Sequence, residues 1–212
     1  RYEIPGDVSS QFVSGLLFAL PLLGGDSEIV VSGQIQSAGY IRMTLDALTA
    51  FSIKTTTTSS GYSVSGNQRY HAKNVPVPEG DWSNAAFWLC AAAINAAAIN
   101  AAAINAAAIN AAACSGGITV TGLNPDSGQG DKAVCDILRR FGATVSQSEN
   151  AVTVHNGKLR GIAVDATDIP DLVPALAVVA AAASGVTTIR NIARLRLKES
   201  DRVQTVCGLI NA

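Results

Sequence analysis

Hydrophobic and polar positions along residues 9–65 change their period several times, and each change predicts a new element. Residues 12–20 are mostly apolar and follow the polar run Ser9-Ser10-Gln11, which is typical of a helix that begins at an N-cap. Gly24-Gly25-Asp26 ends this segment. The pattern then predicts a strand over residues 27–32, a helix over 39–51, and strands over 53–58 and 62–65.

The same order of elements returns twice further along the chain. The second copy is predicted to hold an extended segment over 74–78, a helix beginning at Ser83-Asn84, a strand over 117–122, a helix over 131–141 and a hairpin of 143–148 with 151–155. The third is predicted to hold a strand over 160–165, a helix after Pro170-Asp171, a strand over 186–190 and a last helix beginning near Lys198. This repeat of about 75 residues predicts an α/β (α+β) fold of βαβαββ units.

A boundary between two lobes is expected near Glu79-Gly80-Asp81, which would divide the chain into domains 1–79 and 80–212. The second domain contains a tract, residues 91–113, in which four copies of Ala-Ala-Ala-Ile-Asn are followed by three alanines. Alanine has the highest helix propensity, so a helix is expected. A five-residue period turns about 140° per copy, so the isoleucines form no single apolar stripe. We expect the tract to lengthen one helix by several turns into solvent.

Two other interpretations of the tract stay open. A membrane span is one, because residues 85–113 carry no charge. Against it, alanine is only weakly apolar, asparagine recurs through the tract, and a span needs about 20 apolar residues. An error of sequencing or assembly is the other. No chemistry is assigned to the tract.

Composition narrows the classes of partner. Hydrophobic residues make up 48% of the 212 residues, enough for a sizeable core, and charged residues only 15%, against about a quarter in an average protein. The formal net charge is −1, so no broad basic surface predicts binding to nucleic acid or to an anionic membrane.

Cysteines and histidines are too scattered to predict a metal site or a disulfide framework. They are Cys90, Cys114, Cys135, Cys207, His71 and His155. We expect no metal, reduced thiols and a cytoplasmic protein. The chain begins without Met or an apolar signal segment and stops inside a predicted helix, so we expect an internal fragment of a longer protein.

Two candidate sites stand at predicted helix starts. Ser9-Ser10-Gln11 can bind an anion through its hydroxyls and the free N–H groups of a helix N-terminus, although plain N-capping explains the same residues. Asp171 opens an almost wholly apolar helix, where the pKa of a carboxyl can be raised and suit proton transfer. N-capping is again the alternative.

The run Lys198-Glu199-Ser200-Asp201-Arg202 is the sharpest cluster of charge. On a helix Lys198 and Arg202 lie four residues apart, and Glu199 and Arg202 three apart, so all three can share a face. Two cations beside a carboxylate suit an anionic substrate that needs proton transfer. A solvated charged face is the alternative.

Five short segments in this order resemble the middle of the 5-enolpyruvylshikimate-3-phosphate synthase family. They are residues 6–12, 37–41, 79–83, 168–171 and 197–202. The resemblance implies two partial lobes of inside-out α/β barrel type, built from βαβαββ units. It implies transfer of the enolpyruvyl group of phosphoenolpyruvate to the 5-hydroxyl of shikimate 3-phosphate, with release of phosphate. That reaction belongs to the shikimate pathway of chorismate and aromatic amino acid biosynthesis.

The resemblance also implies roles for single residues. Ser9 and Ser10 would bind the phosphate of shikimate 3-phosphate, Gln11 would touch both substrates, and Ser37 and Tyr40 would line the shikimate side. Asp171 would accept the proton of the 5-hydroxyl, Lys198 would bind near the reacting oxygen, Glu199 would move a proton at the enolpyruvyl carbon, and Arg202 would grip phosphoenolpyruvate. Arg194 stands where some members carry an asparagine ligand. No cofactor, metal, membrane or nucleic acid is implied, and the full-length enzyme is expected to be a monomer.

Further substrate residues of the family would precede residue 1 and follow residue 212, so we expect the chain alone to have no useful turnover. Two alternatives remain. The related enolpyruvyl transferase that acts on UDP-N-acetylglucosamine shares the fold and the donor. A non-catalytic scaffold fragment of the same repeat units is the second.

Overall fold

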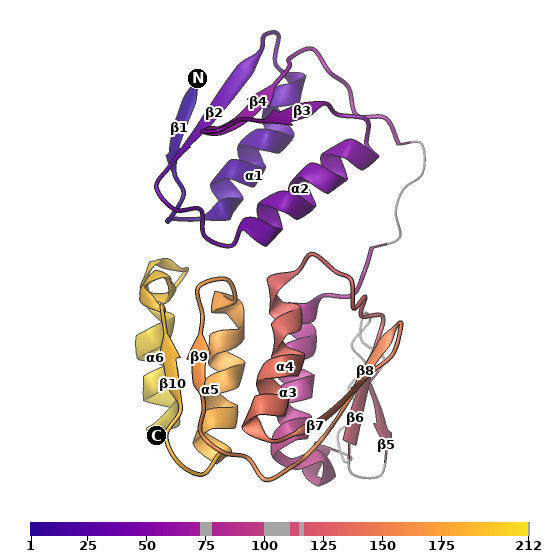
Figure 1. Ribbon diagram of the computed structural model, residues 1–212, viewed down its shortest axis with the longest axis vertical. Helices are drawn as coiled ribbons and strands as arrows, with labels where there is room; N and C mark the ends of the chain where they lie inside the picture. Colours follow the sequence, from indigo (N-terminus) through magenta and orange to yellow (C-terminus); the bar gives the residue numbers. More distant parts are fainter. Residues whose placement is uncertain (73–77, 100–110, 115–116, 212) are drawn as a thin grey trace. The chain divides into compact units, whose positions relative to one another are not determined.

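The computed structural model describes residues 1–72, 78–99, 111–114 and 117–211 (Figure 1). The chain divides into two compact units. Unit 1 comprises Arg1–Pro78 with Gly128–Gly130, and unit 2 comprises Glu79–Ser127 with Asp131–Ala212. Each unit is described by itself.

Unit 1 is one four-stranded sheet with two helices side by side on it (Figure 1). Its elements are β1 (Tyr2–Pro5), α1 (Ser10–Ala19), the 3-10 helix η1 (Leu20–Leu22), β2 (Ser27–Ser32), α2 (Ala38–Ala50), β3 (Thr55–Thr57) and β4 (Gly61–Val64). The strand order is β1-β2-β4-β3, with β1 parallel to β2 and the other pairs antiparallel. This is a complete βαβαββ unit.

The core of unit 1 follows from helical spacing of apolar residues. In α1 the buried residues Val13 and Leu17 lie four apart, and Leu20 follows at the next turn. Ile41 and Leu48 supply the buried stripe of α2. Because such stripes lie on one side of a helix, α1 and α2 cover one face of the sheet and leave their N-termini at its edge.

Unit 2 repeats the same kinds of elements. They are α3 (Trp82–Ile99), β5 (Ala111–Cys114), β6 (Gly117–Thr121), the 3-10 helix η2 (Gly130–Ala133), α4 (Val134–Phe141), β7 (Thr144–Gln147), β8 (Ala151–His155), β9 (Ala163–Asp165), the 3-10 helix η3 (Pro170–Leu172), α5 (Val173–Ala182), β10 (Thr188–Arg190), the 3-10 helix η4 (Ala193–Leu197) and α6 (Arg202–Ile210). β5-β6-β8-β7 form an antiparallel sheet, and β9 and β10 form a parallel pair.

The core of unit 2 surrounds α3, which contacts β6, β8 and α5. Trp82 and Leu89 are fully buried, and Ala85, Ala92 and Ala93 are buried with them. Alanines have no side chain beyond Cβ, so α3 can approach its neighbours closely. The indole N–H of Trp82 donates to the carbonyl of Asn124 at 3.1 Å, which satisfies its polar atom in an apolar setting.

The predicted α/β class with βαβαββ units is confirmed, and most predicted elements lie within a few residues of the observed ones. The helix expected over 131–141 begins as η2 and ends at Gly142, whose φ of +113° closes it. Strand β1 was not predicted, because its four residues show no alternation. The extended segment expected over 74–78 lies, apart from Pro78, outside the described residues.

The helix expected for the repeat tract is observed over residues 91–99 as part of α3, but two parts of the expectation are wrong. Ala92 and Ala93, at its start, are buried in the core and do not extend into solvent. At its other end the tract forms strand β5, antiparallel to β6, and no longer a helix. Pairing with an existing strand edge outweighs the helix propensity of three alanines. Residues 100–110 lie outside the described part.

Within the described residues, no helix combines the length and apolar character required for a membrane crossing.

Two glycines of unit 1 give a matched test of this fold. Gly61 begins β4 at a φ of +151°, and a Cβ there would collide with the carbonyl oxygen of Ile29. Gly15 lies inside α1, and nothing comes within 4 Å of its would-be Cβ. We expect Gly61→Ala to lower the free energy of unfolding by about 1–3 kcal/mol, and Gly15→Ala to raise it by roughly 0.5–1 kcal/mol. Urea unfolding followed by circular dichroism measures both, and equal stabilities would contradict the close strand approach.

Candidate functional site

The candidate residues form two groups, one in each unit. In unit 1 they stand at the starts of α1 and α2. Strands β1 and β2 are parallel, so their carboxyl ends lie at the same edge of the sheet. The helices that follow these strands therefore begin at that edge. Two backbone bonds join these turns: Gly6 N–H donates to the carbonyl of Ser32 at 2.8 Å, and Gln36 N–H donates to the carbonyl of Gly6 at 3.0 Å.

Ser9 is the N-cap of α1. Its backbone is extended, and its hydroxyl accepts a hydrogen bond from the N–H of Gln11 at 3.3 Å. Ser10 is buried, with 8% of its surface exposed, and Gln11 is exposed. The capping interpretation of Ser9 is therefore confirmed. The N–H of Phe12 donates to the carbonyl of Ser9 at 3.3 Å, so Ser9 engages two N–H groups of the first turn.

Ser37 precedes α2 in a left-handed conformation, with φ of +55°, and is buried. Left-handed backbone is uncommon for residues other than glycine, and such strain collects at functional sites. Tyr40 is half-buried in the first turn of α2, and its carbonyl accepts from the hydroxyl of Thr44. That hydroxyl also pairs with Ser14 of α1 at 2.7 Å, which ties the two helices together near their middles.

In unit 2 the candidate residues follow the parallel strands β9 and β10. Asp171 lies in η3, six residues after the end of β9, and Pro170 beside it is buried. Lys198 and Arg202 follow β10, before and at the start of α6. The parallel pairing therefore brings together two segments that are far apart in sequence.

The carboxylate of Asp171 is the contact between these segments. Its Oδ1 accepts from Nη1 of Arg202 at 2.6 Å and from Nζ of Lys198 at 3.4 Å. The side chains of both cations are 23% exposed and that of Asp171 is 32% exposed. This ion-pair cluster is thus accessible to solvent but largely covered.

Glu199 holds the other side of the same guanidinium. Its Oε1 accepts from Nε of Arg202 at 3.0 Å and from Nη2 at 2.6 Å. The pKa of Glu199 is lowered, first by a hydrogen bond from its own backbone N–H and then by Arg202. Partial burial disfavours the charged form of Arg202 and by itself would lower its pKa. The hydrogen bonds and charges of Glu199 and Asp171 have the larger combined effect, so the pKa of Arg202 is raised.

The structure corrects the prediction of a helix that begins near Lys198. Helix α6 begins at Arg202, because Asp201 is its N-cap and accepts from the N–H of Gln204 at 3.0 Å. Asp201 is also paired with Arg196 at 2.7 Å. Lys198, Glu199 and Arg202 therefore do not share a helix face. Lys198 and Arg202 meet at Asp171, a residue from another segment, and Glu199 meets Arg202 only locally.

Arg194 lies half-buried on η4, one turn before Lys198. The sequence pattern missed two further polar residues of this region, Asp165 and Asn191. They stand at the ends of β9 and β10 and are hydrogen-bonded to each other at 2.9 and 3.0 Å. The acidic residue at the end of the predicted strand 160–165 was the available signal for the first of them.

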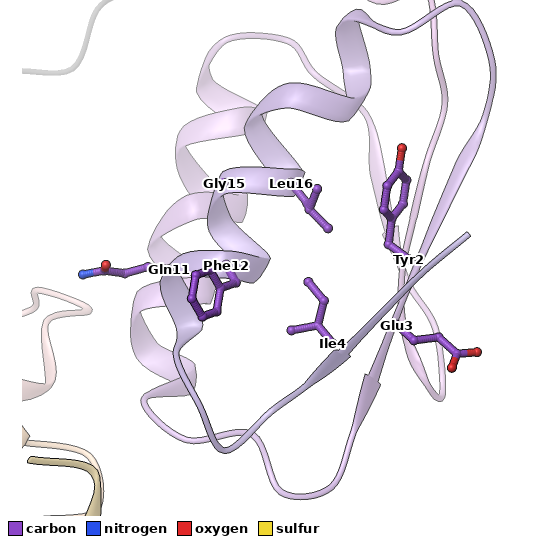
Figure 2. A pocket seen from close by; sticks show the side chains of 7 residues that line it. All are labelled: Tyr2, Glu3, Ile4, Gln11, Phe12, Gly15 and Leu16. Carbon is purple, nitrogen blue, oxygen red and sulfur yellow. The ribbon is translucent and has the colours of Figure 1, made fainter. Parts of the chain in front are cut away.

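A cavity of about 530 Å³ opens beside α1 in unit 1 (Figure 2). Tyr2, Ile4, Phe12 and Leu16 turn toward it, whereas the amide of Gln11 and the carboxylate of Glu3 point away (Figure 2). The side chains that turn toward this space are mostly apolar and carry no positive charge for a phosphorylated ligand. It is part of an exposed apolar face that includes Phe12, which is 58% exposed.

Within the described residues, neither the buried thiols nor a group of metal ligands forms a second candidate site. Burial raises the pKa of Cys90 to about 12 and that of Cys135 to about 11, so neither thiol is a nucleophile near neutral pH. Cys207 is exposed. Within residues 1–72, 78–99, 111–114 and 117–211, no three His, Cys, Asp or Glu residues gather as metal ligands would.

Comparison with known proteins places the chain among enolpyruvyl transferases. A 3-phosphoshikimate 1-carboxyvinyltransferase from Clostridium kluyveri is 39% identical over 211 residues, which are 99% of this chain and 45% of that protein. The protein of the same name from Brachyspira hyodysenteriae is 40% identical over 206 residues, 96% of this chain and 44% of that protein. The chain thus spans under half the length of the curated relatives it matches.

Solved structures agree on the fold. An EPSP synthase from Acinetobacter baumannii matches 97% of this chain and 44% of its own, with a TM-score of 0.64 and 24% identity. The enolpyruvyl transferase NikO from Streptomyces tendae matches 80% of this chain and 36% of its own, with a TM-score of 0.51 and 17% identity. At these identities the likeness shows the fold alone, and it supports the expected enolpyruvyl transferase architecture.

The family pattern described as EPSP synthase (3-phosphoshikimate 1-carboxyvinyltransferase) matches residues 1–107 and 96–211, two segments that overlap inside the repeat tract. The resemblance inferred from five short motifs is thereby confirmed. The two matches together cover both units, so the chain belongs to the EPSP synthase family.

Proposed function

We propose that the protein containing this chain transfers the enolpyruvyl group of phosphoenolpyruvate to the 5-hydroxyl of shikimate 3-phosphate and releases phosphate. The observation that carries the proposal is the ion-pair cluster of unit 2, in which Arg202 and Lys198 meet on Asp171 while Glu199 contacts the same guanidinium. Membership of the family and the names of the relatives support it. The UDP-sugar alternative gains no support from these comparisons.

Arg202 is the residue we assign to phosphoenolpyruvate. A guanidinium has five N–H donors, and Arg202 directs three of them to carboxylates. Two donors on the terminal nitrogens are left for an anionic ligand, in a planar arrangement that suits phosphate or carboxylate. The ammonium group of Lys198 adds a second positive charge near the oxygen that reacts.

Asp171 and Glu199 are assigned the proton transfers. Asp171 would accept the proton of the attacking 5-hydroxyl, so that the oxygen can add to the enolpyruvyl carbon. Glu199 would move the proton at the enolpyruvyl methylene carbon, which gains a proton as the oxygen adds and loses one in the elimination, when the double bond re-forms and the bond to phosphate breaks. The lowered pKa of Glu199 favours the ionised form that accepts the proton in this second step. Addition followed by elimination needs both groups, and no metal or organic cofactor.

The helix starts of unit 1 are assigned to shikimate 3-phosphate. Ser9 and Ser10 would bind its phosphate together with the N–H groups of α1. Gln11 would touch both substrates, and Ser37 and Tyr40 would line the side of the ring. Two helix N-termini at one sheet edge support this assignment.

The proposal extends to the organisation of the protein. Residues 1–79 are assigned to the shikimate-phosphate lobe and residues 80–212 to part of a second lobe. The whole protein is assigned to the cytoplasm as a monomer. Arg194 is kept as a substrate-binding candidate, and its half-buried position on η4 is compatible with contact to a ligand.

Isothermal titration of the chain with shikimate 3-phosphate and with phosphoenolpyruvate tests the function. We expect saturable heats for both ligands and none for pyruvate, which lacks the phosphate group. We also expect no phosphate release at the rates of a complete enzyme. Absence of heat with both phosphorylated ligands would support a scaffold without substrate binding and would overturn the proposal.

Replacing Arg202 tests its assignment. Arg202→Ala removes a charge-assisted contact to the ligand, worth about 1.5–3 kcal/mol, so we expect an affinity for phosphoenolpyruvate roughly 10- to 100-fold weaker. Arg139→Ala is the matched control. Arg139 belongs to the same unit and is also paired with an acidic residue three positions before it, Asp136 at 2.6 Å. Equal losses in the two variants would show that charge alone, and not this site, determines binding.

Arg202 also determines part of the protonation of Glu199. Its hydrogen bond is the second cause of the lowered pKa, after the backbone N–H of Glu199 itself. We expect Arg202→Ala to move the pKa of Glu199 upward, toward but not fully to its ordinary value. A carbon-detected NMR titration of the side-chain carboxyl measures this, and an unchanged or lower pKa would contradict the pairing.

A further inference from the structure

We propose that Asp165 and Asn191 are positioning residues for the ion-pair cluster, holding the segment of Asp171 at a fixed distance from the segment of Lys198 and Arg202. This inference rests on the proposed function of that cluster. Asp165 is the last residue of β9, and Asn191 directly follows β10. Neither residue contacts the cluster itself in the hydrogen bonds observed.

The link between them is a double contact. The side-chain amide of Asn191 donates to Oδ1 of Asp165 at 2.9 Å and to Oδ2 at 3.0 Å. Beside it, the backbone N–H of Ala166 donates to the carbonyl of Arg190 at 3.0 Å. The two strands are therefore cross-linked at the point where each leaves the parallel pair, and we call this link the Asp165–Asn191 clamp.

Both partners are held in place by their own segments. Asp165 also accepts from the backbone N–H of Thr167 at 2.9 Å and from its hydroxyl at 2.6 Å. These bonds from Thr167 and Asn191 lower the pKa of Asp165 to about 2, so the acceptor stays ionised at neutral pH. Asn191 is left-handed, with φ of +61°, a conformation that asparagine tolerates better than most residues.

The clamp lies at the base of two short segments whose tips form the cluster. Asp171 follows Asp165 by six residues, and Lys198 follows Asn191 by seven. Buried side chains anchor each segment between base and tip, Ile169 on one and Leu195 on the other, and Leu172 is buried directly after Asp171. With base, middle and tip all fixed, the distance between Asp171 and the two cations is set before a ligand arrives.

The exposed positions of Asp165 and Asn191 indicate that the clamp does more than stabilise the fold. Asp165 and Asn191 are both exposed, and polar contacts at such positions contribute little to the free energy of unfolding. A change of geometry at the base would nevertheless be transmitted to the tips, where the closest distance between Nη1 of Arg202 and Oδ1 of Asp171 is 2.6 Å.

NMR of the Arg202 side chain tests the clamp without any ligand. The heteronuclear NOE of Nε reports how tightly the guanidinium is held, and Asp171→Ala gives the value for a guanidinium held by Glu199 alone. We expect Asn191→Gly, which keeps the left-handed backbone but loses the amide, to move the NOE at least halfway to that value. Thr167→Ala, which removes only the local hydroxyl bond to Asp165, should leave it unchanged.

A reciprocal exchange separates positioning from damage to the fold. The double variant Asp165→Asn with Asn191→Asp restores an amide-to-carboxylate contact, and we expect it to recover the wild-type NOE and backbone amide spectrum. A wild-type NOE in Asn191→Gly, or no recovery in the double variant, would overturn the inference. The double variant decides the question if Asn191→Gly fails to fold.

Affinity for phosphoenolpyruvate supplies a second measurement. If the chain binds this ligand as proposed, Asn191→Gly should weaken binding by about 3- to 10-fold and the double variant should restore it. If the wild-type chain does not bind it, the proposed function fails while the NOE still decides whether the clamp positions Arg202. Weakened binding with an unchanged NOE would also overturn the positioning role.

Discussion

The contact of Asp171 with Lys198 and Arg202 is the interaction on which the functional interpretation of this protein depends. It joins residues 27 and 31 positions apart in sequence, and it exists because β9 and β10 run parallel and end together. The side chains of both cations are 23% exposed and that of Asp171 is 32% exposed, so the pairs are only partly open to solvent. The proposed function uses this arrangement for the binding of an anionic ligand and for proton transfer.

Packing around α3 imposes the second constraint. The helix is buried along Trp82, Leu89 and the alanines at 92 and 93, and it contacts both the antiparallel sheet and α5. Helix α5 follows η3, which carries Asp171. The small side chains of α3 thus allow α5 and η3 to pack closely against this helix, and the packing positions Asp171.

Comparison of the two four-stranded sheets shows how the repeat tract is accommodated. In unit 1 the strand beside β2 is β1, which is parallel to it. In unit 2 the corresponding position beside β6 is taken by β5, which is antiparallel and consists of the last alanines of the tract and Cys114. An exposed strand edge offers a row of backbone donors and acceptors to any nearby segment. Backbone pairing can therefore recruit a sequence whose side chains favour a helix.

Sequence alone determined the elements in which local period and end signals agree. The stripe of Val13 and Leu17 after the Ser9 cap, and the closure of α4 at Gly142, follow from short-range chemistry. The same is true of the five motifs that indicate the family. Only the tertiary structure decided where α6 begins, where the tract turns into a strand, and that Asp165 and Asn191 meet across two strands. The contact of Asp165 with Asn191 joins residues 26 positions apart, the strand of the tract depends on backbone pairing with β6, and the start of α6 depends on competition between a cap and a helix face. The sequence pointed to Lys198, Glu199 and Arg202 because they could share a helix face. In the structure, Lys198 and Arg202 instead meet at the carboxylate of Asp171. Long-range strand pairing determines the position of that carboxylate.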